Sequence, residues 1–189
     1  GVFGSDDHLF AKAVFFYDDV KDFIAPKGWF EPTTPPTVYY SSQNVGHVVR
    51  KGIELSGTYA AGQFSTSVSY GLLHAVDKET NERMNGITPQ SANLKLAYAF
   101  PAQAINVWYR AHWSKGGESS VEDRATGKNL HFSSFLTHSL GAEWSPKVAD
   151  LANLQAGIAV VNLFDKEYRM LNGSYGSGRG VRLWLSAQF

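Results

Sequence analysis

Residues 154–168 read LQAGIAVVNLFDKEY, and after a glycine-rich break residues 178–189 read GRGVRLWLSAQF. The final stretch alternates in character along its whole length. One face would carry Val181, Leu183, Leu185, Ala187 and Phe189, and the other Arg182, Trp184, Ser186 and Gln188. A strand with one apolar and one more polar face is typical of bacterial outer-membrane β-barrels, in which alternate residues contact lipid.

Composition limits the classes of protein that remain. The 189 residues suit one domain, and 17 Lys and Arg balance 17 Asp and Glu, so no net field attracts nucleic acid. The absence of Cys excludes disulfides and thiolate metal sites. The sequence has no run of about 18 apolar residues that could form a transmembrane helix, which leaves a membrane-spanning β-barrel open. A soluble β-sandwich with an aromatic core is the alternative on composition.

Alternating segments recur along the chain and predict about eight antiparallel strands. These cover approximately 8–24, 38–59, 64–76, 94–100, 105–113, 130–144, 154–169 and 175–189. The connections alternate between short turns and long loops, the latter centred near Pro35, Arg83, Glu122 and Gly173. Short periplasmic turns and long extracellular loops are typical of outer-membrane barrels. The sequence therefore predicts an all-β fold, an antiparallel transmembrane β-barrel segment.

Short motifs in the same order and spacing resemble those of one receptor family. The segment NVGHVVRKGIE contributes Asn44, Gly46, Gly52, Ile53 and Glu54. The segment NLFDKEY contributes Asn162, Leu163, Phe164, Asp165 and Tyr168, and the final stretch contributes Gly178, Arg179 and Phe189. Together these residues resemble the closing strands of TonB-dependent outer-membrane receptors, and the resemblance extends over most of the chain.

The resemblance implies a barrel of about 22 strands around an N-terminal plug domain. Residues 1–189 would form the C-terminal part of that barrel, without the plug, the earlier strands or the segment that contacts TonB. The first and last strands would then leave unpaired edges. The implied partners in the bacterial outer membrane are lipid, the receptor's own plug and remaining strands, TonB, and the barrel-assembly machinery, which would bind the C-terminal strand at Phe189.

Charged side chains on the polar faces are candidates for the inner wall of the barrel. They are Lys12, Glu54, Lys95, Arg110, Glu143 and Arg182. Facing a plug, they would form hydrogen bonds and ion pairs; the alternative is that they are ordinary solvated wall residues.

The resemblance further implies active import of a scarce nutrient, with no enzymatic activity and no cofactor. A ferric siderophore or another iron chelate is the first expectation, and Trp29, Tyr39, Tyr40 and Trp113 could offer it an aromatic surface. One alternative is a haem or haemoglobin receptor of the same family, for which His74 and His131 lie nearest the outer loops. The other is a complete small eight-stranded barrel with a structural role. No motif with metal-ligand spacing occurs.

Overall fold

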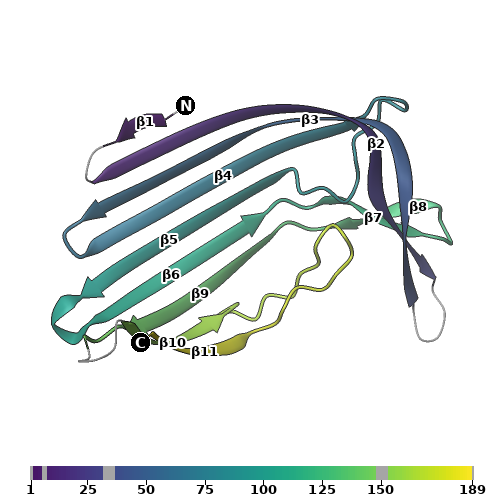
Figure 1. Cartoon of the computed structure of the whole chain (residues 1–189). Helices are drawn as coiled ribbons and strands as arrows, with labels where there is room; N and C mark the ends of the chain where they lie inside the picture. The colour runs from purple at the N-terminus through teal and green to yellow at the C-terminus, as the bar shows by residue number, and fades with distance from the viewer. Residues whose placement is uncertain (1, 6–7, 32–36, 148–152, 189) are drawn as a thin grey trace.

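The computed structural model describes residues 2–5, 8–31, 37–147 and 153–188 and is built on one large sheet (Figure 1). Its strands are β1 (Val2–Ser5), β2 (Leu9–Glu31), β3 (Thr37–Ala61), β4 (Phe64–Asp77), β5 (Gln90–Phe100), β6 (Ile105–Ser114), β7 (Gly117–Asp123), β8 (Lys128–Phe132), β9 (Phe135–Trp144), β10 (Asn153–Val161) and β11 (Gly180–Gln188). A short 3-10 helix, Pro101–Gln103, links β5 to β6. No helix among the described residues is long and apolar enough to cross a membrane.

The main wall runs in the order β2, β3, β4, β5, β6, β9, β10, β11, with each strand antiparallel to its neighbour. Tight connections, such as Gly62–Gln63, lie at the end of the sheet where both chain termini lie (Figure 1). Gly62 has a φ of +57°, a conformation that glycine adopts without steric cost. The longer connections 78–89 and 162–179 lie at the opposite end, hereafter the loop end. The predicted alternation of short and long connections is therefore present where the connections are described in full, which excludes those that contain residues 32–36 and 148–152.

The predicted number of strands was wrong: the sheet has eleven strands in the described residues. The additional strands are β1, which pairs with the start of β2, and the hairpin β7–β8, which begins in the loop expected between residues 113 and 130 and extends to Phe132. The strand predicted at 130–144 divides at Ser133–Ser134 into β8 and β9. The last two strands are shorter than predicted, because Asn162 and Asp165 take positive φ values of 48° and 52° and turn the backbone out of the sheet.

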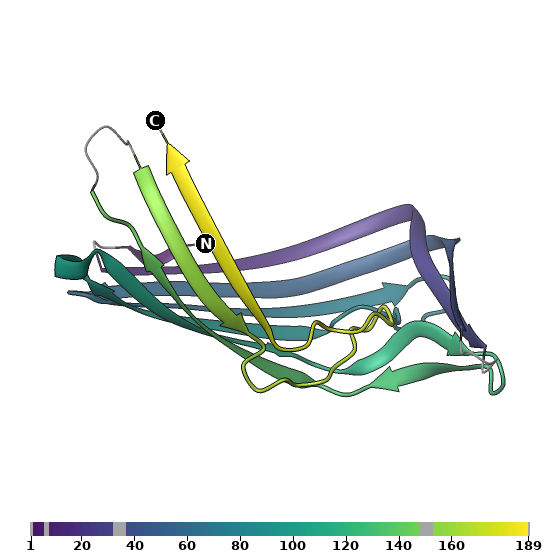
Figure 2. The ribbon, with the colours of Figure 1, turned by 90° about the horizontal axis from the view of Figure 1, so that it is seen from below.

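The hairpin β2–β3 extends well beyond the wall. Pro26 was expected in a loop, yet β2 continues through it to Glu31, because β3 keeps pairing alongside and places Ser42 opposite Pro26. Residues 32–36, which include the predicted loop centre Pro35, lie outside the described residues. The hairpin bends at Asp22, whose φ is 55°, and its tip turns across the loop end (Figure 2). There β2 pairs in parallel with β7, so a loop from between β6 and β9 reaches the far side of the wall.

The two faces of the wall differ sharply in chemistry. Large apolar side chains cover one face, hereafter the apolar face, and remain exposed: Leu183 is 76% exposed, Leu185 74% and Phe15 71%. Register places all six predicted inner-wall charges on the opposite face, hereafter the inner face. An apolar surface of this extent suits lipid rather than water. The sheet stays open in the described residues, since β11 pairs only with β10 and β1 covers only part of the other edge.

Large aromatic rings on the inner face lie across glycines of the adjacent strand. Register sets Trp108 opposite Gly141, Trp184 opposite Gly157, and Phe16 opposite Gly52. A Cβ atom at Gly141 would lie 2.4 Å from the Trp108 ring, and one at Gly157 would lie 2.1 Å from the Trp184 ring. Because rings cover these backbones, Trp108 is buried with Ala97 and Ala159 in the only packed cluster of the described wall strands β5–β11. Aromatic side chains that cover glycines in this way strengthen strand pairing.

Candidate functional site

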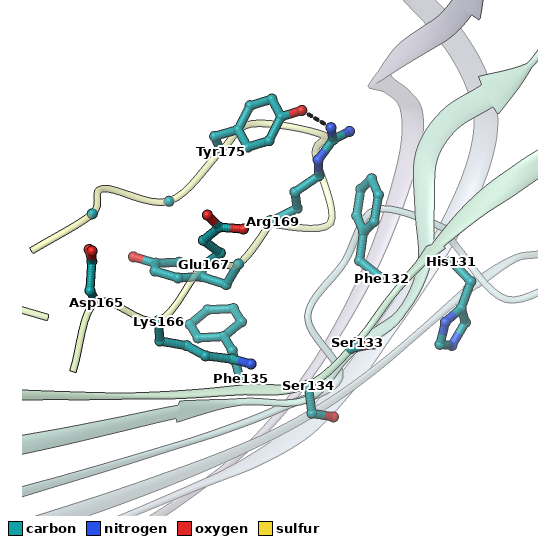
Figure 3. Close-up of a pocket in the computed structure, with 13 residues that line it drawn as sticks. His131, Phe132, Ser133, Ser134, Phe135, Asp165, Lys166, Glu167, Arg169 and Tyr175 are labelled. Atoms are coloured by element: carbon teal, nitrogen blue, oxygen red, sulfur yellow. Dashed lines mark hydrogen bonds between the residues drawn. The ribbon is translucent and has the colours of Figure 1, made fainter.

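A cavity of about 710 Å³ lies at the loop end, between the β8–β9 junction and the loop 162–179 (Figure 3). We call it the vestibule. It is lined by His131, Phe132, Ser133, Ser134, Phe135, Asp165, Lys166, Glu167, Tyr168, Arg169, Tyr175, Gly176 and Gly178. Phe135 belongs to the inner face, since residues two apart on a strand share a face and Thr137 and Ser139 of β9 lie on the inner face. The vestibule therefore opens above the inner face of the wall.

Aromatic rings and one cation dominate the chemistry of the vestibule. Phe135 and Tyr168 stack with ring centroids 4.1 Å apart. The Arg169 guanidinium lies 3.9 Å from the centre of the Tyr175 ring and 5.7 Å from that of Phe132, and it donates a hydrogen bond to the Tyr175 hydroxyl (Figure 3). Flat apolar surface beside a guanidinium suits a ligand that is both aromatic and anionic.

The family-motif residues of the last loop act as its internal supports. The side-chain amide of Asn162 donates to the carbonyls of Lys166 and Ser177, each at 2.9 Å, and its oxygen accepts from the Lys166 N–H at 2.9 Å. The Asp165 carboxylate accepts from the Arg179 N–H at 2.7 Å. Asn and Asp tolerate the positive φ that both positions adopt. The motif thus closes the base of the loop that forms one side of the vestibule.

The other motif residues are distributed along the sheet. Leu163 donates its N–H to the His138 carbonyl at 2.7 Å, and the exposed Phe164 ring meets the edge of the His138 ring on the apolar face. Gly178 lies beside the Asp165 carboxylate. Gly52 makes room for the Phe16 ring, Glu54 lines the inner face, and Asn44 is exposed near the tip of the β2–β3 hairpin. Phe189, the predicted assembly signal, lies outside the described residues.

Strand β7 contacts three separate segments at the loop end. Its Ser119 and Val121 are buried, at 0% and 1% exposure. Val121 lies opposite Gly28 of the β2 tip, the Ser120 N–H donates to the Leu171 carbonyl at 3.0 Å, and the Glu118 carbonyl accepts from the Gly86 N–H at 3.0 Å. Three separate loops are thereby connected through one short strand.

The predicted aromatic ligand surface is only partly assembled. Trp29 and Tyr39 stack at 5.5 Å on the hairpin tip, with the Arg124 guanidinium 5.1 Å from the Trp29 ring. Tyr40 lies on the same tip and extends its hydroxyl toward Gly173. Trp113 does not join them, because register sets it between Ala92 and Leu136 on the apolar face. Its alternation with Arg110 and His112 along the strand already indicated that orientation.

The inner face below the vestibule carries the predicted charges. A cavity of about 450 Å³ is lined by Arg110, Glu143, Arg182, Trp108 and Trp184, and it shares Tyr168 with the vestibule. Lys95 lies directly opposite Arg110. Lys12 and Glu54 line a smaller recess farther along the same face.

Several cations of this face have no acidic partner in the described part of the chain. Among the described residues, the ion pair of this face is Asp18–Arg50 at 3.1 Å, and it does not involve Lys95, Arg110 or Arg182. The Arg110 guanidinium lies 4.6 Å from the centre of the Trp108 ring. The buried indole N–H of Trp108 also has no acceptor among the described residues. Buried donors are normally satisfied, so a further group is expected against this face.

The histidines considered for haem are not arranged as ligands. His74 lies opposite Lys51 on the apolar face, and His131 points away from Phe132 and Arg169 (Figure 3). His112 reaches the inner face, where its Nδ1 lies 2.7 Å from the Asn93 amide oxygen. The described residues contain no group of three His, Cys, Asp or Glu side chains placed to hold a metal ion.

Sequence reasoning missed the principal residues of the vestibule. Arg169, Tyr175, Phe132 and Phe135 were assigned to strands, although 168–175 reads YRMLNGSY, an aromatic and basic segment interrupted by Gly173. That composition could have indicated a loop with binding chemistry.

These features together define a class: a wall of an outer-membrane β-barrel, apolar outside, charged inside, with loops gathered over one end. Residues 2–163 match the family described as TonB dependent receptor-like, beta-barrel, and the chain belongs to that family. The family consists of receptors and transporters, and it places the chain in the bacterial outer membrane.

Individual relatives match along nearly the whole chain. The heme/hemopexin utilization protein C of Haemophilus influenzae is 24% identical over 186 residues, which are 96% of this chain and 26% of that protein. The TonB-dependent heme receptor A of Haemophilus ducreyi is 24% identical over 214 residues, which are 100% of this chain and 28% of that protein. The solved FrpB iron transporter from Neisseria meningitidis superposes with a TM-score of 0.68 at 21% identity, over 95% of this chain and 28% of that one. The chain thus spans about a quarter of the length of its curated relatives.

Proposed function

We propose that the chain forms wall and vestibule of a TonB-dependent receptor that imports an iron-containing compound, with haem as the first candidate. The names of the relatives in Haemophilus favour haem over the ferric siderophore expected from the sequence. The observation that carries the proposal is the vestibule, where stacked aromatic rings adjoin the Arg169 guanidinium. Haem is a flat aromatic macrocycle with two carboxylates, and such rings and such a cation recognise those two features.

The proposal extends to the rest of the receptor. In the described part of the chain the sheet is open and the outer edge of β11 has no partner strand, which favours pairing with further strands of a larger barrel. Cations of the inner face that lack an acidic partner among the described residues, together with the Trp108 N–H, favour contact with a plug domain. We propose TonB as the energy-coupling partner and the barrel-assembly machinery as the partner of the C-terminal strand.

The function is tested by titrating the purified protein, expressed from its whole gene, with haem and separately with ferric siderophores. We expect haem to bind with a change in its absorbance spectrum, and cells that lack other haem receptors to grow on haem iron only when they carry the gene. Binding and growth with a ferric siderophore alone would instead support the second candidate substrate. Failure with both compounds would contradict the proposed import of iron.

Replacing Arg169 with Gln should weaken haem binding about 10- to 30-fold, because a charge-assisted contact to a carboxylate contributes roughly 1.5–2 kcal/mol. Arg169→Lys should lose less, since it keeps the charge but not the planar fork. Spectroscopic titration measures both. Arg179→Gln is the matched control, because it removes the same charge from the exposed base of the same loop. An equal loss in the control would mean that only the overall charge of the loop matters.

Lys95 and Arg110 of the inner face should affect the melting temperature of a bound plug. Lys95 and Arg110 are like charges in direct register, so they repel unless acidic groups of a plug lie between them. If a plug is bound, Lys95→Gln with Arg110→Gln should lower the calorimetric melting temperature of the plug by about 5–10 °C. Lys128→Gln, on the β7–β8 hairpin, should leave this melting temperature unchanged. A rise in melting temperature in the double variant would show that the cations have no partner on a plug.

A further inference from the structure

A polar row crosses the apolar face near the loop end. Register sets Tyr17 directly opposite Lys51, and Lys51 directly opposite His74, on three adjacent strands. The row immediately before it is wholly apolar and consists of Phe15, Ile53 and Leu72. The face that contacts lipid therefore changes from hydrocarbon side chains to cationic and hydrogen-bonding ones within a single step along each strand.

The row lies close to the expected outer boundary of the membrane. Tyr59 marks the opposite boundary on β3, beside the short turn and close to the exposed Phe64 and Tyr98. From Tyr59 to Lys51 the strand rises by roughly 26 Å, which a tilt of about 40° reduces to roughly 20 Å along the membrane normal. The apolar band of such barrels is about 25 Å tall. Lys51 and His74 therefore lie about 5 Å below the outer edge of that band, a distance that an extended lysine side chain spans to reach the lipid headgroups.

The cations of this region are available for an external ligand. Lys51 and His74 are exposed and have no side-chain hydrogen bond or ion pair within the described part of the chain. Lys21 lies one row nearer the loop end than Asp19, and the backbone of Arg83 pairs with that of Val76 on the same face. Further positive charge therefore lies on the loop-end side of the row. Two acids of this region already have neighbours: Asp19 is bound to His47, and the Glu79 carboxylate lies over Gly46.

We infer that this row binds the phosphate groups of the phosphorylated glycolipid that forms the outer leaflet of the membrane. Lys51 supplies charge to the phosphate, the His74 ring donates a hydrogen bond, and Tyr17 places its ring among acyl chains and its hydroxyl at the headgroup. Lys21 and Arg83 add long-range attraction from above. The headgroup is held by its acyl chains against the apolar row below, which free phosphate lacks, and charge clusters beside a membrane surface commonly select anionic lipid.

Native mass spectrometry of the whole purified protein with lipid A carrying two, one or no phosphates tests this inference. We expect bound lipid to persist with two phosphates and to fall about fivefold for each phosphate removed. Lys51→Gln with His74→Gln should weaken binding of the diphosphorylated lipid five- to tenfold, whereas Lys128→Gln, on the β7–β8 hairpin, should not. Inorganic phosphate at millimolar concentration should not compete.

Equal binding of lipid A with and without phosphates would overturn the inference, because the acyl chains alone would then explain the contact. Equal binding by the double variant and the parent protein would overturn it too. Competition by inorganic phosphate would show a simple anion site rather than a lipid site. Haem titration of the double variant should match that of the parent, which separates this result from failure of the proposed import function.

Discussion

Replacing Asn162 with Ala should weaken haem binding by at least tenfold, although Asn162 itself lies at the base of the loop rather than among its ring side chains. The substitution removes three hydrogen bonds to Lys166 and Ser177 and leaves Ala at a φ of 48°. We expect the free energy that favours the closed conformation of the loop over open ones to fall by about 3 kcal/mol. Tyr168, Arg169 and Tyr175 would then no longer be held around the vestibule.

Hydrogen exchange and haem titration together measure this effect. The backbone amides of Lys166 and Arg179 should exchange faster in the Asn162→Ala protein, in parallel with the loss of affinity. Asn172→Ala is the matched control, because among the described residues its side chain bonds only to Ser174, at the exposed tip of the same loop. Unchanged exchange and unchanged affinity in Asn162→Ala would disprove the supporting role given to the motif.

Replacing Gly141 with Val should prevent most of the protein from assembling as a folded barrel. A Cβ atom there would lie 2.4 Å from the Trp108 ring and 2.9 Å from the Ile158 carbonyl, so ring and backbone must both move. Overpacking of this kind costs about 3 kcal/mol, and Gly157→Val should act similarly through Trp184. The fraction that migrates as folded protein on unheated gels measures the effect.

Gly71→Val provides a closely matched control. Gly71 also lies on the inner face, opposite Glu54, but a Cβ atom there would meet only the Ser91 hydroxyl at 3.6 Å. This variant should fold as well as the parent, since valine suits a strand that has room for it. If Gly71→Val and Gly141→Val fold equally well, or equally badly, the rings do not determine which glycines are required.

The wall could be predicted from sequence because its pattern is local. Each strand meets lipid on one side and the lumen on the other, so alternation alone places Lys95, Arg110 and Arg182 on one face and Leu183 on the opposite face. The same alternation places Trp113 and His74 on the face that meets lipid. Neither side chain can therefore contact a compound in the lumen.

The loop end could not be predicted because its contacts join distant segments. The pairing of Gly28 with Val121 joins β2 to a hairpin between β6 and β9, and neither segment contains a signal for the other. The vestibule likewise depends on Phe135 meeting Tyr168 across a turn that Asn162 and Asp165 create. Those positive φ values end β10 at Val161, where apolar residues alone suggested that the strand continues.

Energy-coupled import is tested most directly by the initial rate of uptake of iron-labelled haem by cells that carry the gene, with and without a functional TonB. We expect saturable uptake that is lost on removing TonB, while binding of haem at the cell surface persists. Uptake that continues unchanged without TonB, in cells with no other haem receptor, would contradict the assignment of this wall to an energy-coupled importer.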